Sequence, residues 1–418
     1  MSGPADDEAP ARTRRELLRT PVGALVAGKI SSTLGVWTTN IAGAILVFQL
    51  TGSALIVGMV SVLQFTPQLV LTPLTGARAD RSDRFLQVIF GTLVTGVGAL
   101  LLVAWAVTVG FTTERDAYVV VIAAGLIGTG FSLTGPAQSA LLPALVRRSE
   151  LPDALALASL PIILARSVGP AVGATLYLTA GATVTFAVSL LFQGAFLVLL
   201  VWLRRRVTLA PRDAAANTDR RVRAGLAYLR RSPRTLLQIL GVAVIGVAVD
   251  PITTLTPSLA AALGQPSSFV GTLASSFGIG ATVGFVVLSR VRARVGVVRL
   301  GAVGLAIMGA GTLLAAIAPT ALLAVAGVSV GGVGMTFSLN AFTTLVQRDV
   351  PDALRGRVMA LWSMAFLGSR PVTALLTGTL TDLLGVRSAL ALSGIVVLAG
   401  AFATRGSRML ARPQALEG

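Results

Sequence analysis

The sequence contains no cysteine and no histidine among its 418 residues. Without cysteine the protein can form neither a disulfide nor a thiolate metal site. Without histidine it lacks the commonest zinc ligand and the usual general base of enzymes. It also has no Gly-x-x-x-x-Gly-Lys-Ser/Thr loop, which would indicate ATP binding. We therefore predict that the protein is not an enzyme and that it uses no metal and no cofactor.

Charged residues are scarce as well. They make up 12% of the sequence, against roughly 25% in an average soluble domain, whereas hydrophobic residues make up 54%. The mean hydropathy is +0.83. These values exclude a disordered chain, a fibrous repeat and an ordinary cytosolic enzyme, because a soluble protein of this length needs more charge to cover its surface. The composition predicts a membrane protein.

Twelve apolar stretches follow one another along the chain, each of about the 20 residues that a membrane-spanning helix requires. They lie near residues 21–49, 54–77, 85–111, 117–142, 154–178, 182–203, 235–262, 267–289, 299–318, 321–345, 357–381 and 386–404. The first follows a polar tail and lacks the cleavage site of a signal peptide. The sequence therefore predicts an all-α membrane protein with twelve transmembrane helices.

The basic residues alternate along the chain with these stretches. The net charge is +17, and 29 of the 34 Lys and Arg residues lie in the two tails and in every second loop. The intervening loops hold only Arg115 and Arg387. Basic residues concentrate on the cytoplasmic side of membrane proteins, so this pattern places both termini in the cytoplasm. It also explains the positive charge without a nucleic-acid partner.

A long basic loop divides the chain into two halves of six stretches. The tetrapeptide Pro-Asp-Ala-Leu occurs at 152–155 and again at 351–354, in matching places of the two halves. Chance similarity between apolar helices is the alternative explanation. A parallel repeat of two pseudo-symmetric six-helix bundles is a transporter architecture with a binding site at the midplane. The predicted organisation is a cytoplasmic N-tail (1–20), an N-terminal bundle (21–203), a cytoplasmic linker (204–234), a C-terminal bundle (235–404) and a cytoplasmic C-tail (405–418).

The loop at 76–84 reads Gly-Ala-Arg-Ala-Asp-Arg-Ser-Asp-Arg. It resembles the loop signature of the major facilitator superfamily, Gly-x-Leu-Ala-Asp-Arg-x-Gly-Arg, and its Asp-Arg variant resembles the branch of enterobactin exporters and macrolide-efflux proteins. The resemblance implies that this loop latches the cytoplasmic side of the transporter, with a solvated turn as the alternative. The matching residues that we assign to this gating loop are Gly76, Asp80, Arg81 and Arg84.

Further stretches, among them 28–37 and 165–173, are similar to the same branch, so the resemblance covers almost the whole chain. Many relatives have an acidic residue just before the first-helix Trp, whereas this sequence has Val36. Gly169, Pro170 and Gly173 resemble the part of helix 5 associated with antiporters, which implies export. Proline also removes a backbone hydrogen bond and kinks a helix, so an ordinary kink is the alternative.

Four charged residues lie deep within predicted spans: Asp250, Lys29, Arg166 and Arg370. A charge at this depth costs at least about 2.5–3.5 kcal/mol, so such residues usually face an internal cavity. Burial disfavours the charged form of a carboxylate whereas a nearby cation favours it. Asp250 is therefore the candidate proton carrier. The alternative is a fixed counter-ion of Lys29 or of an arginine.

The three cations make the predicted cavity positive, which suits a substrate with an acidic group. Arg166 also resembles a family arginine that bonds carbonyls between helices, so its role is substrate binding or structural. Polar and aromatic residues in the spans are further candidates for the substrate cavity, and each has packing as its alternative role. They are Trp37, Asn40, Gln64 and Asn340.

We predict a secondary active transporter, a proton-coupled antiporter that exports a small amphipathic molecule of the drug or siderophore class by alternating access. The expected partners are that substrate, protons and the lipid bilayer of the cell membrane, and the chain is expected to act as a monomer. An uptake carrier or uniporter is the alternative within transport. A lipid-translocating protein or a non-transporting membrane scaffold is the alternative from another class.

Overall fold

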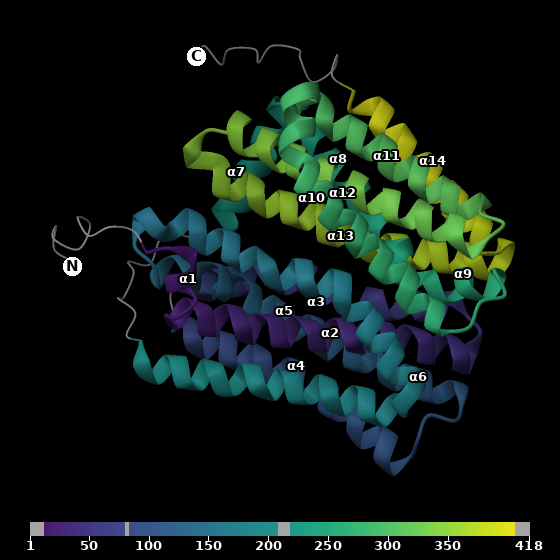
Figure 1. Ribbon diagram of the computed structural model, residues 1–418. Helices are drawn as coiled ribbons and strands as arrows, with labels where there is room; N and C mark the ends of the chain where they lie inside the picture. The colour runs from purple at the N-terminus through teal and green to yellow at the C-terminus, as the bar shows by residue number, and fades with distance from the viewer. Residues whose placement is uncertain (1–11, 80–82, 208–217, 406–418) are drawn as a thin grey trace. The chain divides into compact units, whose positions relative to one another are not determined.

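The computed structural model describes residues 12–79, 83–207 and 218–405, and these residues form helices and connecting turns with no β-strand among them (Figure 1). The helices are α1 (Arg14–Leu17), α2 (Pro21–Thr51), α3 (Ala54–Ala79), α4 (Arg84–Thr108), α5 (Ala117–Ala144), α6 (Leu151–Arg206), α7 (Thr218–Arg231), α8 (Pro233–Thr254), α9 (Thr256–Ala262), α10 (Ser268–Val295), α11 (Val297–Ile317), α12 (Ala321–Asp349), α13 (Asp352–Leu384) and α14 (Val386–Ala403). Two 3₁₀ turns, η2 (Glu114–Asp116) and η3 (Arg148–Glu150), precede α5 and α6.

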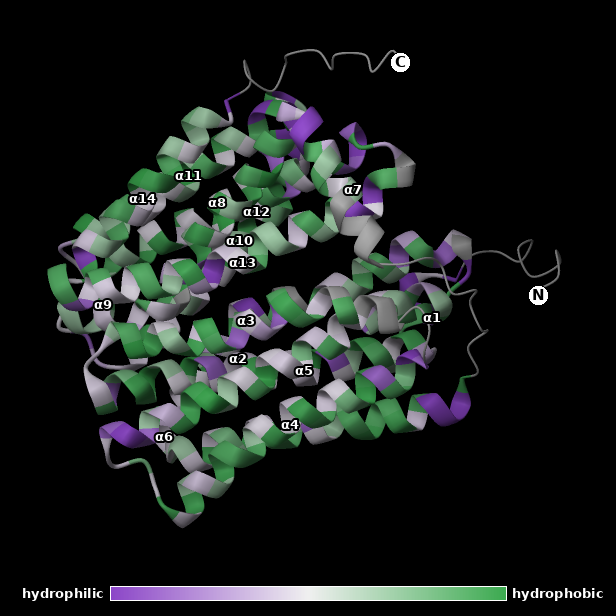
Figure 2. Ribbon diagram, turned by 180° about the vertical axis from the view of Figure 1, so that it is seen from behind, coloured by the Kyte–Doolittle hydropathy of each residue, from purple (hydrophilic) through white to green (hydrophobic). Residues whose placement is uncertain are grey.

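Eleven helices of the described part of the chain are long and apolar enough to cross a membrane. They are hydrophobic along most of their length (Figure 2). Several begin at a capping residue: Asp83, Ser232 and Thr320 each accept a hydrogen bond from a backbone N–H in the first turn of α4, α8 and α12. The prediction of an all-α membrane protein is confirmed.

Helix α6 contains two of the predicted spans, 154–178 and 182–203, in one run of 56 residues. Its backbone leaves the helical conformation at Gly181, where φ is 80° and ψ is 175°. Only glycine adopts these angles readily. The parts of α6 before and after Gly181 each exceed the roughly 20 residues of one crossing. The number of crossings, twelve, stays a prediction.

The chain divides into two compact units. Unit 1 consists of Met1–Ala42 and Pro67–Ala216, and unit 2 of Gly43–Thr66 and Asn217–Gly418. The end of α2 and the first half of α3 therefore group with the C-terminal helices. The sequence-based division at the linker 204–234 stays a prediction.

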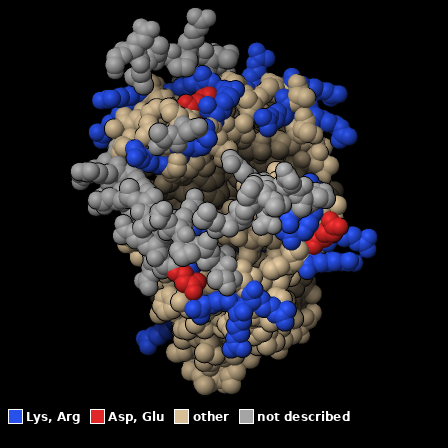
Figure 3. All heavy atoms as spheres, turned by 90° about the vertical axis from the view of Figure 1, so that its left-hand side faces the viewer, with Lys and Arg blue, Asp and Glu red and all other residues tan. Residues whose placement is uncertain are grey.

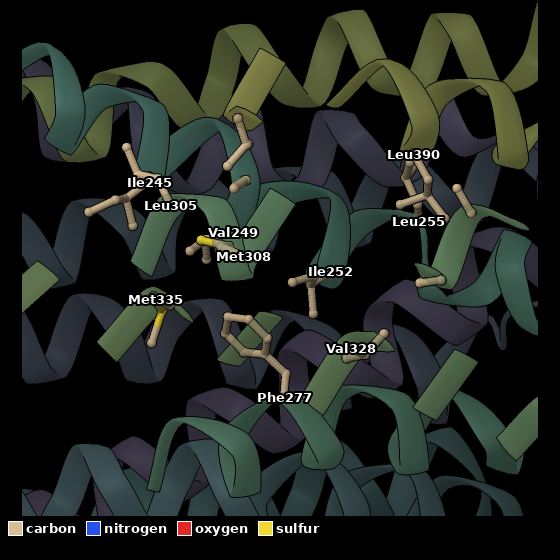
Figure 4. Close-up of a cluster of buried hydrophobic side chains, with 14 of the residues drawn as sticks. Ile245, Val249, Ile252, Leu255, Phe277, Leu305, Met308, Val328, Met335 and Leu390 are labelled. Carbon is tan, nitrogen blue, oxygen red and sulfur yellow. The ribbon is translucent and has the colours of Figure 1, made fainter. Parts of the chain in front are cut away.

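Each unit has its own hydrophobic core. In unit 1, side chains from α1, α2, α4, α5 and α6 meet in one cluster that includes Leu17, Phe85, Leu141, Phe196 and Leu200. The core of unit 2 joins α8, α10, α11, α12 and α14 (Figure 4). Its members include Ile245, Phe277, Leu305, Met308 and Met335. A charged group buried in a span needs a partner nearby, because an unpaired charge in apolar surroundings is costly.

Candidate functional site

Asp250 and Arg370, two of the charged residues predicted to lie deep in the spans, form an ion pair within unit 2. Asp250 lies near the end of α8 and Arg370 in the middle of α13, and the Asp250 Oδ1 is 3.6 Å from the Arg370 Nε. The carboxylate is completely buried, and Arg370 is 8% exposed. The structure thus gives Asp250 an arginine partner. This pairing is what the alternative role of Asp250, a counter-ion of an arginine, requires.

Three further residues complete the surroundings of this pair. The Thr254 hydroxyl donates to the Asp250 main-chain carbonyl at 3.0 Å and lies 3.5 Å from Oδ2. The Ser61 side chain of α3 hydrogen-bonds the same carboxylate. The Arg370 guanidinium lies over the Phe65 ring at 3.7 Å from its centroid, within the range of a cation–π interaction. We call these five residues the α8–α13 charge cluster.

A close approach of the two helices brings the pair together. Gly246 lies one turn before Asp250, and a Cβ there would come within 2.5 Å of the Phe366 carbonyl oxygen of α13. Gly58 of α3 lies similarly close to α13, since a Cβ added there would be 2.7 Å from the Ala374 carbonyl oxygen. These small residues let three backbones pack tightly, as is common in membrane helices.

In unit 1 the structure brings together Arg166 and Trp37. The Arg166 guanidinium lies 6.0 Å from the Trp37 ring centroid. Gly169 lies against the Trp37 Cβ and Gly173 against the Thr38 backbone, so both glycines allow α6 to approach α2. The backbone at Gly169, Pro170 and Gly173 stays helical, and the non-helical residue inside α6 is Gly181.

The remaining cavity candidates are distributed over both units. Lys29 and Asn40 are half-buried residues of α2 in unit 1. Gln64 of α3 is buried, and Asn340 of α12 is half-buried with a buried Oδ1 that has no hydrogen-bond partner among the described residues; both belong to unit 2.

The predicted gating loop is only partly covered by the structure. Gly76 belongs to α3, whereas Asp80 and Arg81 lie outside the described residues. Arg84 donates to the Ala140 carbonyl at 3.3 Å. Asp83, at the position where the family signature has glycine, caps α4 and pairs with Arg204 at 3.1 Å. The sequence did not predict this ion pair between Asp83 and Arg204.

Two further acidic residues have roles that the sequence did not predict. Each precedes a Pro-Asp-Ala-Leu repeat by two positions. Glu150 binds the Arg12 guanidinium through two contacts of 2.7 Å, and this side-chain hydrogen bond with Arg12 is the main cause that lowers the pKa of Glu150 to about 2. Asp349 pairs with Arg234 at 3.0 Å and accepts from Gln238 at 2.7 Å. Glu150 therefore fixes the segment that precedes α2, and Asp349 fixes the first turns of α8.

A third missed residue is Asp382, near the end of α13. Its carboxylate accepts hydrogen bonds from the Ser53 hydroxyl at 2.5 Å and from the backbone N–H groups of Ala54 and Leu55 at 2.7 and 3.2 Å. It thus caps the N-terminus of α3 from another helix. Its position near a predicted helix end gave no sign of this role.

Comparison with known proteins agrees with this picture of a transporter. The family model described as "transmembrane secretion effector" matches residues 18–415. The macrolide efflux protein A of Streptococcus pyogenes is 24% identical over 362 residues, which cover 83% of this chain and 86% of that protein. An enterobactin exporter EntS of Citrobacter koseri is 26% identical over 354 residues, 82% of this chain and 78% of that protein.

The fold is similar to that of a bacterial homologue of the iron transporter ferroportin, solved in an inward-facing state. That structure has a TM-score of 0.75 at 15% sequence identity, with 95% of this chain and all of that chain covered. The family-model match and the efflux relatives, together with the spanning helices, identify a multi-pass membrane transporter of the major facilitator superfamily. Within it, the chain belongs to the transmembrane secretion effector family. The expectation that it is not an enzyme is confirmed.

Proposed function

We propose that the protein is a proton-coupled antiporter that exports a small amphipathic molecule across the cell membrane. Relatives named as efflux proteins and exporters support the direction of transport. The observation that carries the proposal is the completely buried Asp250 carboxylate in a spanning helix, 3.6 Å from Arg370. A buried carboxylate beside a cation is poised between its charged and neutral forms, because burial and the cation act in opposite directions.

In the proposed cycle, Asp250 takes a proton from water on the outer side and becomes neutral. The neutral acid no longer holds Arg370 by charge, so the ion pair is replaced by weaker hydrogen bonds. Rocking of the two halves then exposes Asp250 to the cytoplasm, where it loses the proton and regains Arg370 as its partner. Substrate moves outward during the opposite half of the cycle.

The proposal includes the membrane topology: twelve crossings in two six-helix halves, with both termini in the cytoplasm. Among the described side chains visible in Figure 3, Lys and Arg outnumber Asp and Glu. This distribution fits the excess of basic residues on the cytoplasmic side of membrane proteins. The loop around Asp80 and Arg81 is proposed to latch this side.

The test uses purified protein in liposomes and compares Asp250→Asn with the wild type and with Glu114→Gln. Glu114 is an exposed carboxylate in η2 and serves as the matched control. We expect Asp250→Asn to lose substrate accumulation driven by a pH gradient but to keep substrate counterflow, which needs no net proton movement. Glu114→Gln should keep both.

Accumulation in Asp250→Asn at the wild-type rate would refute the role of Asp250. If Asp250→Asn loses both counterflow and accumulation, a second explanation exists. Asparagine leaves Arg370 buried without its charged partner, which by itself can disable the protein. The double variant Asp250→Asn/Arg370→Gln removes both charges and resolves this case. Its counterflow should exceed that of Asp250→Asn if the unpaired guanidinium is the cause.

A further inference from the structure

A cavity of about 390 Å³ lies in unit 2, beside the turn between α2 and α3. Its walls are the ends of α2, α9 and α13, the start of α14, and the turn at Gly52 and Ser53. In both ribbon views α9 lies at the opposite end of unit 2 from α7 (Figures 1 and 2). Because α7 belongs to the linker that is proposed to be cytoplasmic, the cavity lies at the end of unit 2 that is proposed to face outward.

Two buried hydroxyl groups in the wall of this cavity have no hydrogen-bond partner among the described residues. They belong to Ser258 of α9, which is 7% exposed, and Thr381 of α13, which is 9% exposed. Buried polar groups are nearly always hydrogen-bonded, either to protein or to ordered water. Since both residues line the cavity, water inside it is their available partner. The Asp382 carboxylate adds a negative charge to the same wall, which favours protonated water there.

A row of buried hydroxyls leads from this cavity along α13 to Arg370. The row consists of Thr373, Thr377 and Thr381, which are 4%, 5% and 9% exposed. Spacings of three, four and four residues, counted from Arg370, place the row on one side of the helix. Thr373 donates to the Ser369 carbonyl at 2.9 Å and Thr377 to the Thr373 carbonyl at 2.8 Å. At 1.5 Å per residue the row is about 16 Å long.

A second row leads to the same cavity from Asp250. Thr254 and Ser258 follow Asp250 at intervals of four residues, across the junction of α8 and α9. The Thr254 side chain is buried, and its hydroxyl lies 3.5 Å from the Asp250 Oδ2. Hydroxyls that bond their own helix are ordinary in membrane helices. These two rows differ because they begin at one ion pair, Asp250 with Arg370, and end at one cavity.

We propose that this cavity is the water-filled entrance through which protons from the outer side reach Asp250, and that the two hydroxyl rows hold the water chain that carries them. The inference rests on the proposed proton coupling and adds its entrance and path. A hydronium ion in the cavity gives a proton to the first oxygen of the chain, and each oxygen accepts one proton while releasing another. The Asp250 carboxylate binds the last proton, and neutral water remains in the cavity. Arg370 stays charged throughout.

The entrance is tested by cysteine accessibility, because the native chain has no cysteine. Intact cells that hold Ser258→Cys or Thr381→Cys are treated with a small, cationic, membrane-impermeant methanethiosulfonate, and unreacted thiols are then measured with a maleimide in denaturant. The matched control is Ser393→Cys in α14, since Ser393 is 4% exposed and lies outside the cavity wall. Both cavity cysteines should react at least about tenfold faster than the control, because the reagent enters a cavity but not a packed interior. Rates equal to that of Ser393→Cys would overturn the proposal.

The path is tested with Thr254→Val/Thr377→Val, which interrupts both rows and nearly keeps the shape of the side chains. The matched control is Thr92→Val in α4, because Thr92 is also buried and also donates to a carbonyl one turn earlier at 2.8 Å. In liposomes with a trapped pH dye, the double variant should slow substrate-driven proton movement about tenfold, since each lost hydroxyl removes a hydrogen bond from the chain. Thr92→Val should leave proton movement unchanged. An unaltered rate in the double variant would overturn the path.

Loss of substrate counterflow in the double variant would indicate damage beyond the path, and Thr254→Ser/Thr377→Ser then decides. This variant keeps both hydroxyls, so it should keep proton movement, and its failure to do so would overturn the path. The cysteine assay needs no proton gradient. Accumulation in Asp250→Asn at the wild-type rate would therefore refute proton coupling through Asp250 without changing the labelling rates. Slow labelling together with lost accumulation in Asp250→Asn would refute the entrance alone.

Discussion

The contact between Glu150 and Arg12 offers a prediction whose magnitude follows from the structure. The Glu150 side chain is fully buried at the start of α6, and its two oxygens take both guanidinium contacts of Arg12 at 2.7 Å. Replacement by glutamine keeps the size of the side chain but removes its charge. We expect Glu150→Gln to loosen the segment that contains α1 without unfolding unit 1.

The pKa of Glu150 falls from an ordinary 4.5 to about 2, mainly through the side-chain hydrogen bond from Arg12. At about 1.4 kcal/mol for each pKa unit, this shift corresponds to roughly 3 kcal/mol. The Arg12 side chain is 35% exposed, so water screens part of the interaction. The expected loss is therefore about 1–2 kcal/mol, which corresponds to roughly a tenfold increase in local opening.

The sign of the pH dependence follows from the lowered pKa. Because the folded state holds the charged carboxylate, the contribution of Glu150 is fully present above about pH 4.5. It is lost as the pH falls through the folded pKa of about 2. The difference between the wild type and Glu150→Gln should therefore be constant from pH 5 to pH 8 and shrink below that range.

Hydrogen exchange of residues 13–20, read by mass spectrometry in lipid nanodiscs, measures the local opening. Asp153→Asn is the matched control, since Asp153 pairs with Arg14 of the same segment through side chains that are 43% and 65% exposed. An exposed pair contributes little, so this variant should exchange nearly as the wild type does. Equal exchange in the wild type and Glu150→Gln at pH 7 would refute the reasoning, as would an equal effect of both variants.

Three further predictions concern topology, packing and capping. The native chain lacks cysteine, so a single introduced cysteine is the only site that a maleimide can label. A membrane-impermeant maleimide should label Glu114→Cys in intact cells but Arg294→Cys only after permeabilisation. The reverse order would contradict the topology. Gly246→Ala should lower the melting temperature in detergent by an amount equivalent to roughly 1–3 kcal/mol, whereas Gly356→Ala, where a Cβ meets no atom within 4 Å, should not. Asp382→Ala should weaken the first turn of α3 by about 1 kcal/mol, measured by hydrogen exchange there; unchanged protection would contradict its capping role.

Much of the fold followed from apolar length alone, because a bilayer permits few structures other than helices for such a chain. The location of the helix breaks followed in part. The break at Gly181 falls between the predicted spans 154–178 and 182–203, whereas a second break was not predicted. The span predicted at 235–262 is divided into α8 and α9, which meet at Leu255 after Pro251. Such breaks depend on one residue's backbone angles, which hydropathy does not report.

The candidate site was predictable where charge is rare and not where it is common. Asp250 and Arg370 stood out because nothing else charged lies near them in the sequence, and the structure pairs them. Ser61 and Phe65 were not identifiable, because serine and phenylalanine are ordinary in apolar helices and only tertiary packing brings them to the pair. Glu150 resembled a solvated loop charge; its place before a repeated tetrapeptide was the available signal.

The most direct test of proton-coupled export is to record both fluxes in the same liposomes. The compound with the strongest counterflow is added to one side, and a trapped pH dye reports the protons that move in response. The account predicts proton movement opposite to the substrate in the wild type and none in Asp250→Asn. Substrate movement with no change in the dye signal of the wild type, or an unchanged signal in the variant, would contradict it.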